Sequence, residues 1–306
     1  MNNSKIFFFM GKGGTGKSTV SAISGLMLAE SKKKVMVISL DSAHNLSDIY
    51  ETPLAHKPRE IGPFLHAGEI DQEKMIQKYL KDVQLSLKRR YSYLTAFNIE
   101  NYFDILKYSP GLEEYALMLA FNNIIDKYSN FDYIIFDMPP TALSLKFFNL
   151  PFLSGKWIEH LEDLRCEINK KREIISKVKF AGKEYERDKI LSKIRELKDQ
   201  YQSIGKIFQD SDRTGVFIVI NYDSLAVSET RRIFNSLEKI KISIKKIIWN
   251  RKRKGDSFDD IDNSLSLIPF FSLPFSSERL TGFNALNNYI KAVDLKVSDF
   301  FKQNKK

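Results

Sequence analysis

A glycine-rich loop near the amino terminus carries the residue pattern with the clearest chemistry. Residues 11–18, GKGGTGKS, fit G-x-x-x-x-G-K-[ST] and stand between the apolar run 6–10 and a helix-like segment of small residues. Successive backbone N–H groups of such a loop, together with the start of the following helix, surround a polyphosphate. Lys17 would bridge the β- and γ-phosphates, and the Ser18 hydroxyl would bind Mg²⁺. The loop predicts binding and hydrolysis of a nucleoside triphosphate, with these contacts: Gly13, Gly14, Thr15, Gly16, Lys17, Ser18 and Thr19.

Lys12 is a second lysine inside this loop, and the loop needs only its backbone to surround the phosphates. One interpretation of its side chain is a solvated surface lysine. The other is a positive charge that is delivered across a dimer interface to the phosphates bound by a partner subunit.

Two aspartates follow apolar runs that are typical of buried strands. Asp41 follows the run 35–40, where it could orient the attacking water or hold a metal-bound water; the alternative is a helix N-cap before a solvated loop. Asp137 follows the run 133–136 in the arrangement of a Walker-B aspartate, which acts on Mg²⁺, often through water. We therefore predict the catalytic residues Lys12, Lys17 and Asp41, and the metal-binding residues Ser18 and Asp137.

Weaker signals come from the carboxyl-terminal third of the chain. Asn250 ends an apolar run, and its amide could read a base edge with both a donor and an acceptor. The loop 273–282, which contains Pro274, could wall the base pocket. Each could equally be an ordinary turn at the end of a strand.

Composition limits the function classes only loosely. The 306 residues are 43% hydrophobic and 28% charged, which suits a soluble globular chain with a substantial core. The net charge of +10 is weak evidence for an anionic partner, because the lysines are mixed with acids and form no contiguous stripe. The single cysteine, Cys166, excludes an internal disulfide and a zinc site built from one chain's cysteines. Without a leader-like start or an apolar run of roughly 20 residues, the chain is expected in the cytoplasm, with no transmembrane segment.

Short apolar runs alternate with segments that can form helices. This alternation predicts an α/β fold of the P-loop NTPase kind, with a doubly wound and mainly parallel sheet. In such a sheet the loops described above lie together at the carboxyl ends of the strands. The expected strands are 6–10, 35–40, 133–136, 216–220, 244–249 and 265–273.

Two stretches do not fit the alternation, and they predict a helical subdomain inserted into a single domain that spans residues 1–306. The stretches are about 72–127 and 155–212. In the second, apolar residues recur at spacings of three and four on both sides of Gly182, which favours an antiparallel helical hairpin that turns near this glycine. The aromatic cluster between Tyr91 and Tyr108 could be either the core of this subdomain or part of a binding groove.

With these motifs assembled, the chain resembles the arsenite-pump ATPase (ArsA) family, which includes the ATPase that targets tail-anchored membrane proteins. The resemblance covers nearly the whole chain, and the loop DSAHNLSD is its most specific motif. It rests on these segments: KGGTGKST at 12–19, DSAHNLSD at 41–48, 69–71, DMPPTALSLKFFNLP at 137–151, 228–230 and the regions of Asn250 and Pro274.

The resemblance implies a homodimer with ATP and Mg²⁺ between two facing subunits. In it, Lys12 would reach the partner's phosphates, Asp41 would position the hydrolytic water, and Asp137 would belong to the second switch loop. The remaining implied contacts are Asn45 near the phosphates, and Asn250 and Pro274 at the adenine. Opening and closing of the dimer would then move the helical subdomains.

The chain departs from the family pattern at several places. Ser42 replaces the usual proline of the first switch loop, and Ala142 and Leu143 replace the glycine and histidine of the second. The cysteine pair that binds zinc in the targeting ATPase is absent, as are the cysteines with which a pump subunit recognises arsenite.

Four functions stay open at this point. The first is an ATP-driven carrier or chaperone for a hydrophobic protein segment, whose partner would be that client or a membrane-associated protein. The others are a metalloid-pump ATPase subunit, a partition-type ATPase and an ATP-binding regulatory module with little turnover. A thiophilic ligand needs thiolates, which argues against the pump, and nucleic acid is not an expected partner.

Overall fold

A computed structural model describes residues 4–90, 105–179, 188–221, 224–256, 265 and 268–301. Its centre is an eight-stranded sheet in the order β3-β4-β2-β5-β1-β6-β7-β8, parallel throughout except for the antiparallel pair of β3 and β4. The strands are β1 (Lys5–Met10), β2 (Val35–Ser39), β3 (Arg59–Gly62), β4 (Leu65–Glu69), β5 (Tyr133–Asp137), β6 (Thr214–Ile220), β7 (Ile244–Lys252) and β8 (Phe270–Pro274). The expected doubly wound α/β fold is confirmed.

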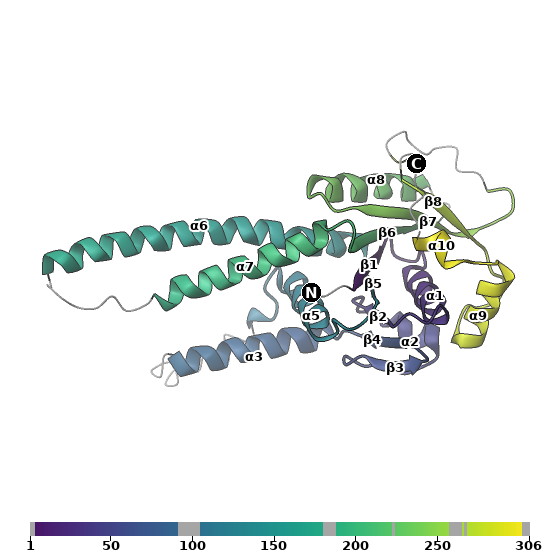
Figure 1. Ribbon diagram of the computed structural model, residues 1–306, viewed down its shortest axis with the longest axis horizontal. Helices are drawn as coiled ribbons and strands as arrows, with labels where there is room; N and C mark the ends of the chain where they lie inside the picture. Colours follow the sequence, from purple (N-terminus) through teal and green to yellow (C-terminus); the bar gives the residue numbers. More distant parts are fainter. Residues whose placement is uncertain are drawn as a thin grey trace.

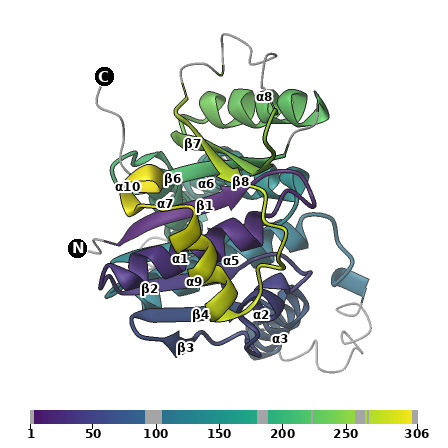
Figure 2. The ribbon, with the colours of Figure 1, turned by 90° about the vertical axis from the view of Figure 1, so that its right-hand side faces the viewer.

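Helices cover both faces of the sheet (Figure 2). One core contains side chains of α5, α6, α7 and α8, and the other contains side chains of α1, α2, α9 and α10. Alternate residues of β1 divide between the cores: Phe8 packs with the first group, and Phe7 and Phe9 with the second. The helices are α1 (Lys17–Glu30), α2 (Asn45–Tyr50), α3 (Gln72–Arg90), α5 (Leu112–Lys127), α6 (Thr141–Lys179), α7 (Lys189–Gln209), α8 (Ser224–Lys239), α9 (Gly282–Ala292) and α10 (Val297–Phe301).

Two strands were missed by the sequence prediction, and two of the expected strands need new bounds. β3 and β4 were not predicted, because both are short and the polar residues of 59–69 hide their pattern. The expected strand 265–273 forms only over Phe270–Pro274, whereas β7 continues three residues past its expected end.

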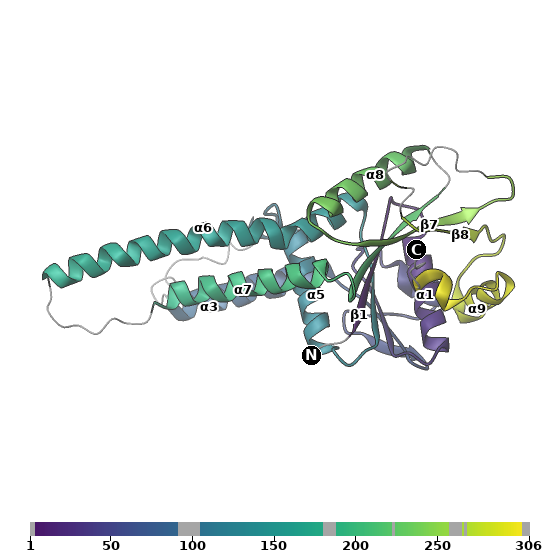
Figure 3. The ribbon, with the colours of Figure 1, turned by 45° about the horizontal axis from the view of Figure 1, so that its top comes forward.

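The long helices α6 and α7 extend away from the sheet on one side, with α3 beside them (Figures 1 and 3). α6 and α7 form an antiparallel hairpin, as shown by the ion pair of Arg165 with Asp188 at 2.8 Å and that of Glu162 with Arg195 at 2.8 Å. The predicted hairpin partners are therefore correct. The turn expected at Gly182 lies outside the described residues.

The limits of the predicted helical insertion stay a prediction, and α6 is not divided at residue 155. It runs as one helix of 39 residues from Thr141, with Pro151 inside it. Of the aromatic cluster, Tyr108 is described and is 78% exposed. The other aromatic residues of this cluster, Tyr91, Tyr93, Phe97, Tyr102 and Phe103, lie outside the described residues.

Candidate functional site

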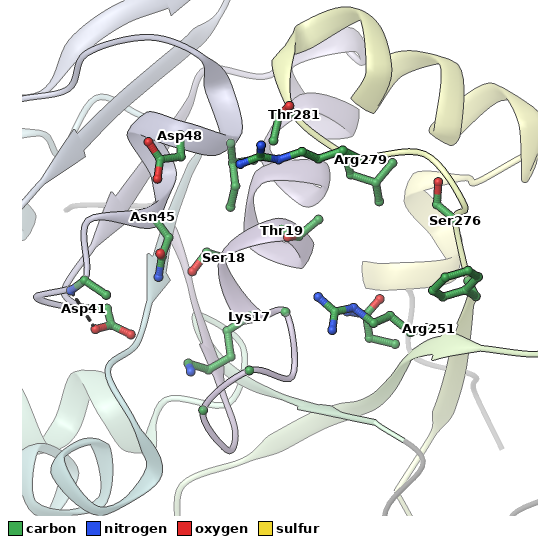
Figure 4. A pocket seen from close by; sticks show the side chains of 18 of the residues that line it. Lys17, Ser18, Thr19, Asp41, Asn45, Asp48, Arg251, Ser276, Arg279 and Thr281 are labelled. Atoms are coloured by element: carbon green, nitrogen blue, oxygen red, sulfur yellow. Dashed lines mark hydrogen bonds between the residues drawn. The ribbon is translucent and has the colours of Figure 1, made fainter.

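A cavity of about 700 Å³ opens at the carboxyl ends of β1, β2 and β7, beside the start of α1 (Figure 4). This is where an open α/β sheet binds its ligand. Most residues predicted to bind or act on the nucleotide line it: Gly13, Gly14, Gly16, Lys17, Ser18, Thr19, Asp41, Asn45, Asn250 and Pro274. Three predicted residues, Lys12, Thr15 and Asp137, are not part of this lining.

The phosphate-binding loop is shaped by close backbone approaches that only glycine permits. Gly16 has a φ of 88°, and a Cβ atom there would lie 2.2 Å from Nδ2 of Asn250. Gly11 has a φ of 151°, and a Cβ atom there would lie 2.2 Å from the carbonyl oxygen of Val219. These positions explain why the motif spaces its glycines as it does.

Asn250, on β7, fixes this loop. Its Nδ2 donates a hydrogen bond of 2.8 Å to the carbonyl oxygen of Thr15, and its side chain is buried. The Thr15 hydroxyl in turn donates to the Lys12 carbonyl oxygen at 2.9 Å. Asn250 thus lines the cavity as predicted, but one donor of the amide expected to read a base holds the loop instead.

Two groups with catalytic chemistry face the cavity. Lys17 is 6% exposed as a whole and lines the cavity beside the loop that would bind phosphates. Asp41 is 8% exposed, and its Oδ1 accepts a hydrogen bond of 3.1 Å from the backbone N–H of Ala43 (Figure 4). That bond fixes the carboxylate and leaves Oδ2 available for a water molecule.

Asp137 lies beneath the cavity, fully buried at the end of β5. Neither of its carboxylate oxygens has a hydrogen-bond partner among the described residues. Burial raises the pKa of Asp137 to about 7, and the neighbouring Ser18 hydroxyl and Lys17 ammonium oppose this rise. Two unpaired buried oxygens next to the Ser18 hydroxyl are what a hydrated Mg²⁺ would satisfy, so the residues present fit this ion.

Lys12 lies on the other side of the loop. With Thr15 it lines a separate small hollow, whose remaining wall includes Glu229 and Thr230 of α8. Lys12 is therefore not among the residues that line the cavity beside its own loop.

A further acidic residue that we did not predict as part of the site supports the loop after β2. Glu69, at the end of β4, is 5% exposed and accepts hydrogen bonds from the Ser47 N–H at 2.8 Å and the Ser47 hydroxyl at 2.6 Å. Nδ1 of His44 lies 3.8 Å from the same carboxylate. The sequence signal for this role is an acid at the end of a strand, and it was missed because β4 was missed.

Comparison with known proteins agrees with this geometry. The model of the anion-transporting ATPase family, ArsA_ATPase, matches residues 4–293. The chain belongs to the ArsA family. The resemblance inferred from the motifs is thereby confirmed, and so is the prediction of an ATP hydrolase.

Individual members of the ArsA family are similar over most of the chain. A protein of Aquifex aeolicus named as arsenical pump-driving ATPase 2 is 27% identical over 307 residues, which are 95% of this chain and 99% of that protein. An ATPase ASNA1 homolog of Babesia bovis is 30% identical over 278 residues, 86% of this chain and 74% of that protein. ATPase get3 of Schizosaccharomyces japonicus is 30% identical over 252 residues, 81% of this chain and 74% of that protein.

Two features are absent from the part of the chain that the structure describes. No described helix combines the length and the apolar composition that crossing a membrane requires. No three His, Cys, Asp or Glu side chains of the described part are grouped closely enough to hold a metal ion by themselves. A metal at the nucleotide site would therefore depend on oxygens from the nucleotide and from water as well as from Ser18 and Asp137.

Proposed function

We propose that this protein is a Mg²⁺-dependent ATPase that works as a homodimer in the cytoplasm and carries or chaperones a hydrophobic protein segment. The observation that supports the nucleotide chemistry is the convergence of Lys17, Ser18 and Asp41 on one cavity, above the unpaired carboxylate of Asp137.

The residues divide the hydrolysis of ATP between them. The loop amides and Lys17 bind the β- and γ-phosphates. Ser18 and Asp137 would hold Mg²⁺, which would supply neutralisation of the phosphate charge. Asp41, held by the Ala43 N–H, orients a water molecule with its second oxygen and accepts a proton from it. Phosphate release and ATP binding by Asp41→Asn test this division, since the variant should bind ATP without turning it over.

Lys12 supports the dimer part of the proposal, because it lies outside its own cavity. A lysine that acts on the partner's phosphates can be tested by mixing two inactive variants, Lys12→Ala and Asp41→Asn. In the mixed dimer, the subunit with intact Asp41 would receive Lys12 from the other subunit, so one site would be complete. Recovery of activity supports action across the interface; its absence in a mixture shown to contain mixed dimers contradicts it.

Exposed apolar side chains support the client part of the proposal. Among the described residues, most large hydrophobic side chains that are exposed lie on the helical part, away from the nucleotide cavity. They are Leu85, Ile105, Leu106, Tyr108, Leu153, Trp157, Leu164, Ile168, Ile174 and Ile190. Exposed apolar residues that gather in one region mark interaction surfaces.

The client is tested by co-expression with a tagged protein that ends in a single hydrophobic helix. Wild type should co-purify with it, whereas the double variant Trp157→Ser, Leu164→Ser should not, at unchanged ATP turnover. The relative from Aquifex aeolicus is named for driving an arsenical pump, so arsenite is added in a parallel assay. Stimulation by arsenite together with failure to retain the helix would favour a pump subunit instead.

A further inference from the structure

Two arginines line the nucleotide cavity at the end where the phosphate-binding loop does not reach. Arg251 follows Asn250 on β7, and Arg279 lies on the loop between β8 and α9. Figure 4 shows their side chains entering the cavity from different walls, with Thr19 between them. Neither guanidinium group has a hydrogen bond or an ion pair with a residue that the structure describes.

Arg251 is aimed into the cavity by an irregularity of β7. The register between β7 and β8 shifts between Trp249 and Lys252, and Arg251 has a φ of 57°. A positive φ is unfavourable for a residue with a long side chain, and such bulges are used beside active sites to redirect a side chain. The strain indicates that the direction of Arg251 has a use.

The wall that carries Arg279 is fixed at both ends. The Phe275 N–H donates to the Lys252 carbonyl oxygen at 2.8 Å, and the Tyr289 hydroxyl donates to the Pro274 carbonyl oxygen at 2.7 Å. At the other end, the Thr281 hydroxyl donates to Oε1 of Glu51 at 2.9 Å. The two arginines therefore project from backbone that is already held in place.

We propose that Arg251 and Arg279 hold the base of the bound nucleotide by stacking their guanidinium planes against it. The planar guanidinium group stacks on aromatic rings and is weakly hydrated, so it can lie against a base at little desolvation cost. Pro274 and Phe275, which line the same end of the cavity, supply the apolar surroundings.

Stacking is favoured over directional reading of the base by the position of Asn250. This residue donates to the carbonyl oxygen of Thr15, so part of its hydrogen-bonding capacity is taken up by the loop. Every base has a π-face, so stacking tolerates changes of base. The ligand class that follows is a nucleoside triphosphate with weak discrimination among bases, so that ATP is preferred over GTP by less than about tenfold.

The inference rests on the proposed nucleotide site, so its test compares ligands with and without a base. Binding of ATP and of inorganic tripolyphosphate is measured by calorimetry for wild type and for Arg251→Ala, Arg251→Gly, Arg251→Lys and Arg279→Ala. Lys254→Ala is the matched control, because it removes the same charge from the same basic run but does not line the cavity. Glycine accepts the positive φ of Arg251 without strain, so Arg251→Gly separates loss of the side chain from a disturbed bulge.

Stacking predicts that Arg251→Ala and Arg251→Gly both weaken ATP binding by about 5- to 30-fold, the range of a cation–π contact. Tripolyphosphate binding should stay within about twofold of wild type, Arg251→Lys should recover only part of the loss, and Arg279→Ala should give a loss of the same kind.

Equal weakening of ATP and tripolyphosphate would overturn stacking, because the guanidinium would then act on phosphate charge. ATP binding as strong as that of wild type in Arg251→Lys, or in Arg251→Gly, would overturn stacking as well. If wild type binds neither ligand, the proposed nucleotide site itself fails, which is a different result from a loss confined to the arginine variants.

Discussion

Helices α1 and α7 differ strongly in how much of each is buried. Of the 14 residues of α1, 12 are buried, including Lys17 and Ser18. Of the 21 residues of α7, only Ile204, Gly205 and Phe208 are buried. α1 is enclosed between the sheet and α2, α9 and α10, whereas α7 packs mainly against α6.

This difference in burial determines how strongly a substitution should act in each region. At the nucleotide site, close packing and glycine contacts determine the positions of the reacting groups, so small changes have large effects. In the hairpin, polar pairs such as Arg165 with Asp188 hold two half-exposed helices, and each contact contributes less. Substitutions in the two regions should therefore differ in size and in what they alter.

The largest effect is expected at Asp41. Asp41→Asn keeps the shape of the side chain but removes the base, so we expect kcat to fall by about 10²- to 10⁴-fold. Phosphate release gives the rate, and calorimetry checks that ATP still binds. If the variant retains most of its turnover, another residue orients the attacking water.

Asp137 should link the site to stability. The pKa of Asp137 rises from an ordinary 3.8 to about 7, so the folded chain holds a proton that the unfolded chain releases. The stability that this proton provides is fully present below pH 3.8, falls progressively as the pH rises from there, and is lost once the pH has passed 7.

We therefore expect Asp137→Asn, measured without nucleotide, to melt at a higher temperature than wild type at pH 8 and to approach it as the pH falls toward 4. ATP turnover should be lost at both values. If the melting temperatures of the two proteins differ by the same amount at every pH, Asp137 does not cause this pH dependence.

A moderate effect is expected at Asp188, which joins the start of α7 to α6. Asp188 pairs with Arg165 and caps α7 through the N–H groups of Leu191 and Ile190. These contacts, that with Arg165 above all, hold the pKa of Asp188 well below the ordinary range. Asp188→Ala should lower the melting temperature by a few degrees at neutral pH. The difference should shrink as the pH falls below the ordinary pKa of an aspartate, because wild type then loses the same contacts.

Glu196→Ala on the same helix is the control, since Glu196 is exposed and pairs only with Lys193 among the described residues. ATP turnover should not change in either variant. Equal melting temperatures for Asp188→Ala and wild type would show that the hairpin does not depend on this cap.

The smallest effect is expected at the exposed apolar residues of α6. Leu153 is 65% exposed, so Leu153→Ser should change the free energy of unfolding by less than about 0.5 kcal/mol. Chemical denaturation measures this value. A larger loss would mean that Leu153 packs against another part of the protein in solution and that the two regions are less different than described.

The features that depend on local sequence were predictable. The apolar runs of β1, β2, β5, β6 and β7 are long enough to stand out, and the loop 11–18 carries its chemistry in adjacent residues. The spacing of apolar residues likewise gave the hairpin.

Features that depend on distant contacts were not predictable. The bond from Asn250 to Thr15 joins residues 235 positions apart, and nothing near either residue indicates it. α6 continues through Pro151, and Phe147 and Phe148 in the preceding turn are fully buried in the core. β4 formed because its backbone completes the sheet beside β2, although its own sequence is weakly strand-like.

Because α6 is long, a small tilt at its base would displace its far end by a much larger distance. At 1.5 Å per residue its 39 residues span about 58 Å, and they begin at Thr141, directly after Pro140 of the nucleotide cavity. If the helix moves as a stiff rod, a tilt of about 5° at its base displaces its far end by about 5 Å. In such a movement, a small adjustment at the base of α6 would become a displacement of side-chain size at Lys179, and Pro151 would be the weakest point along the helix.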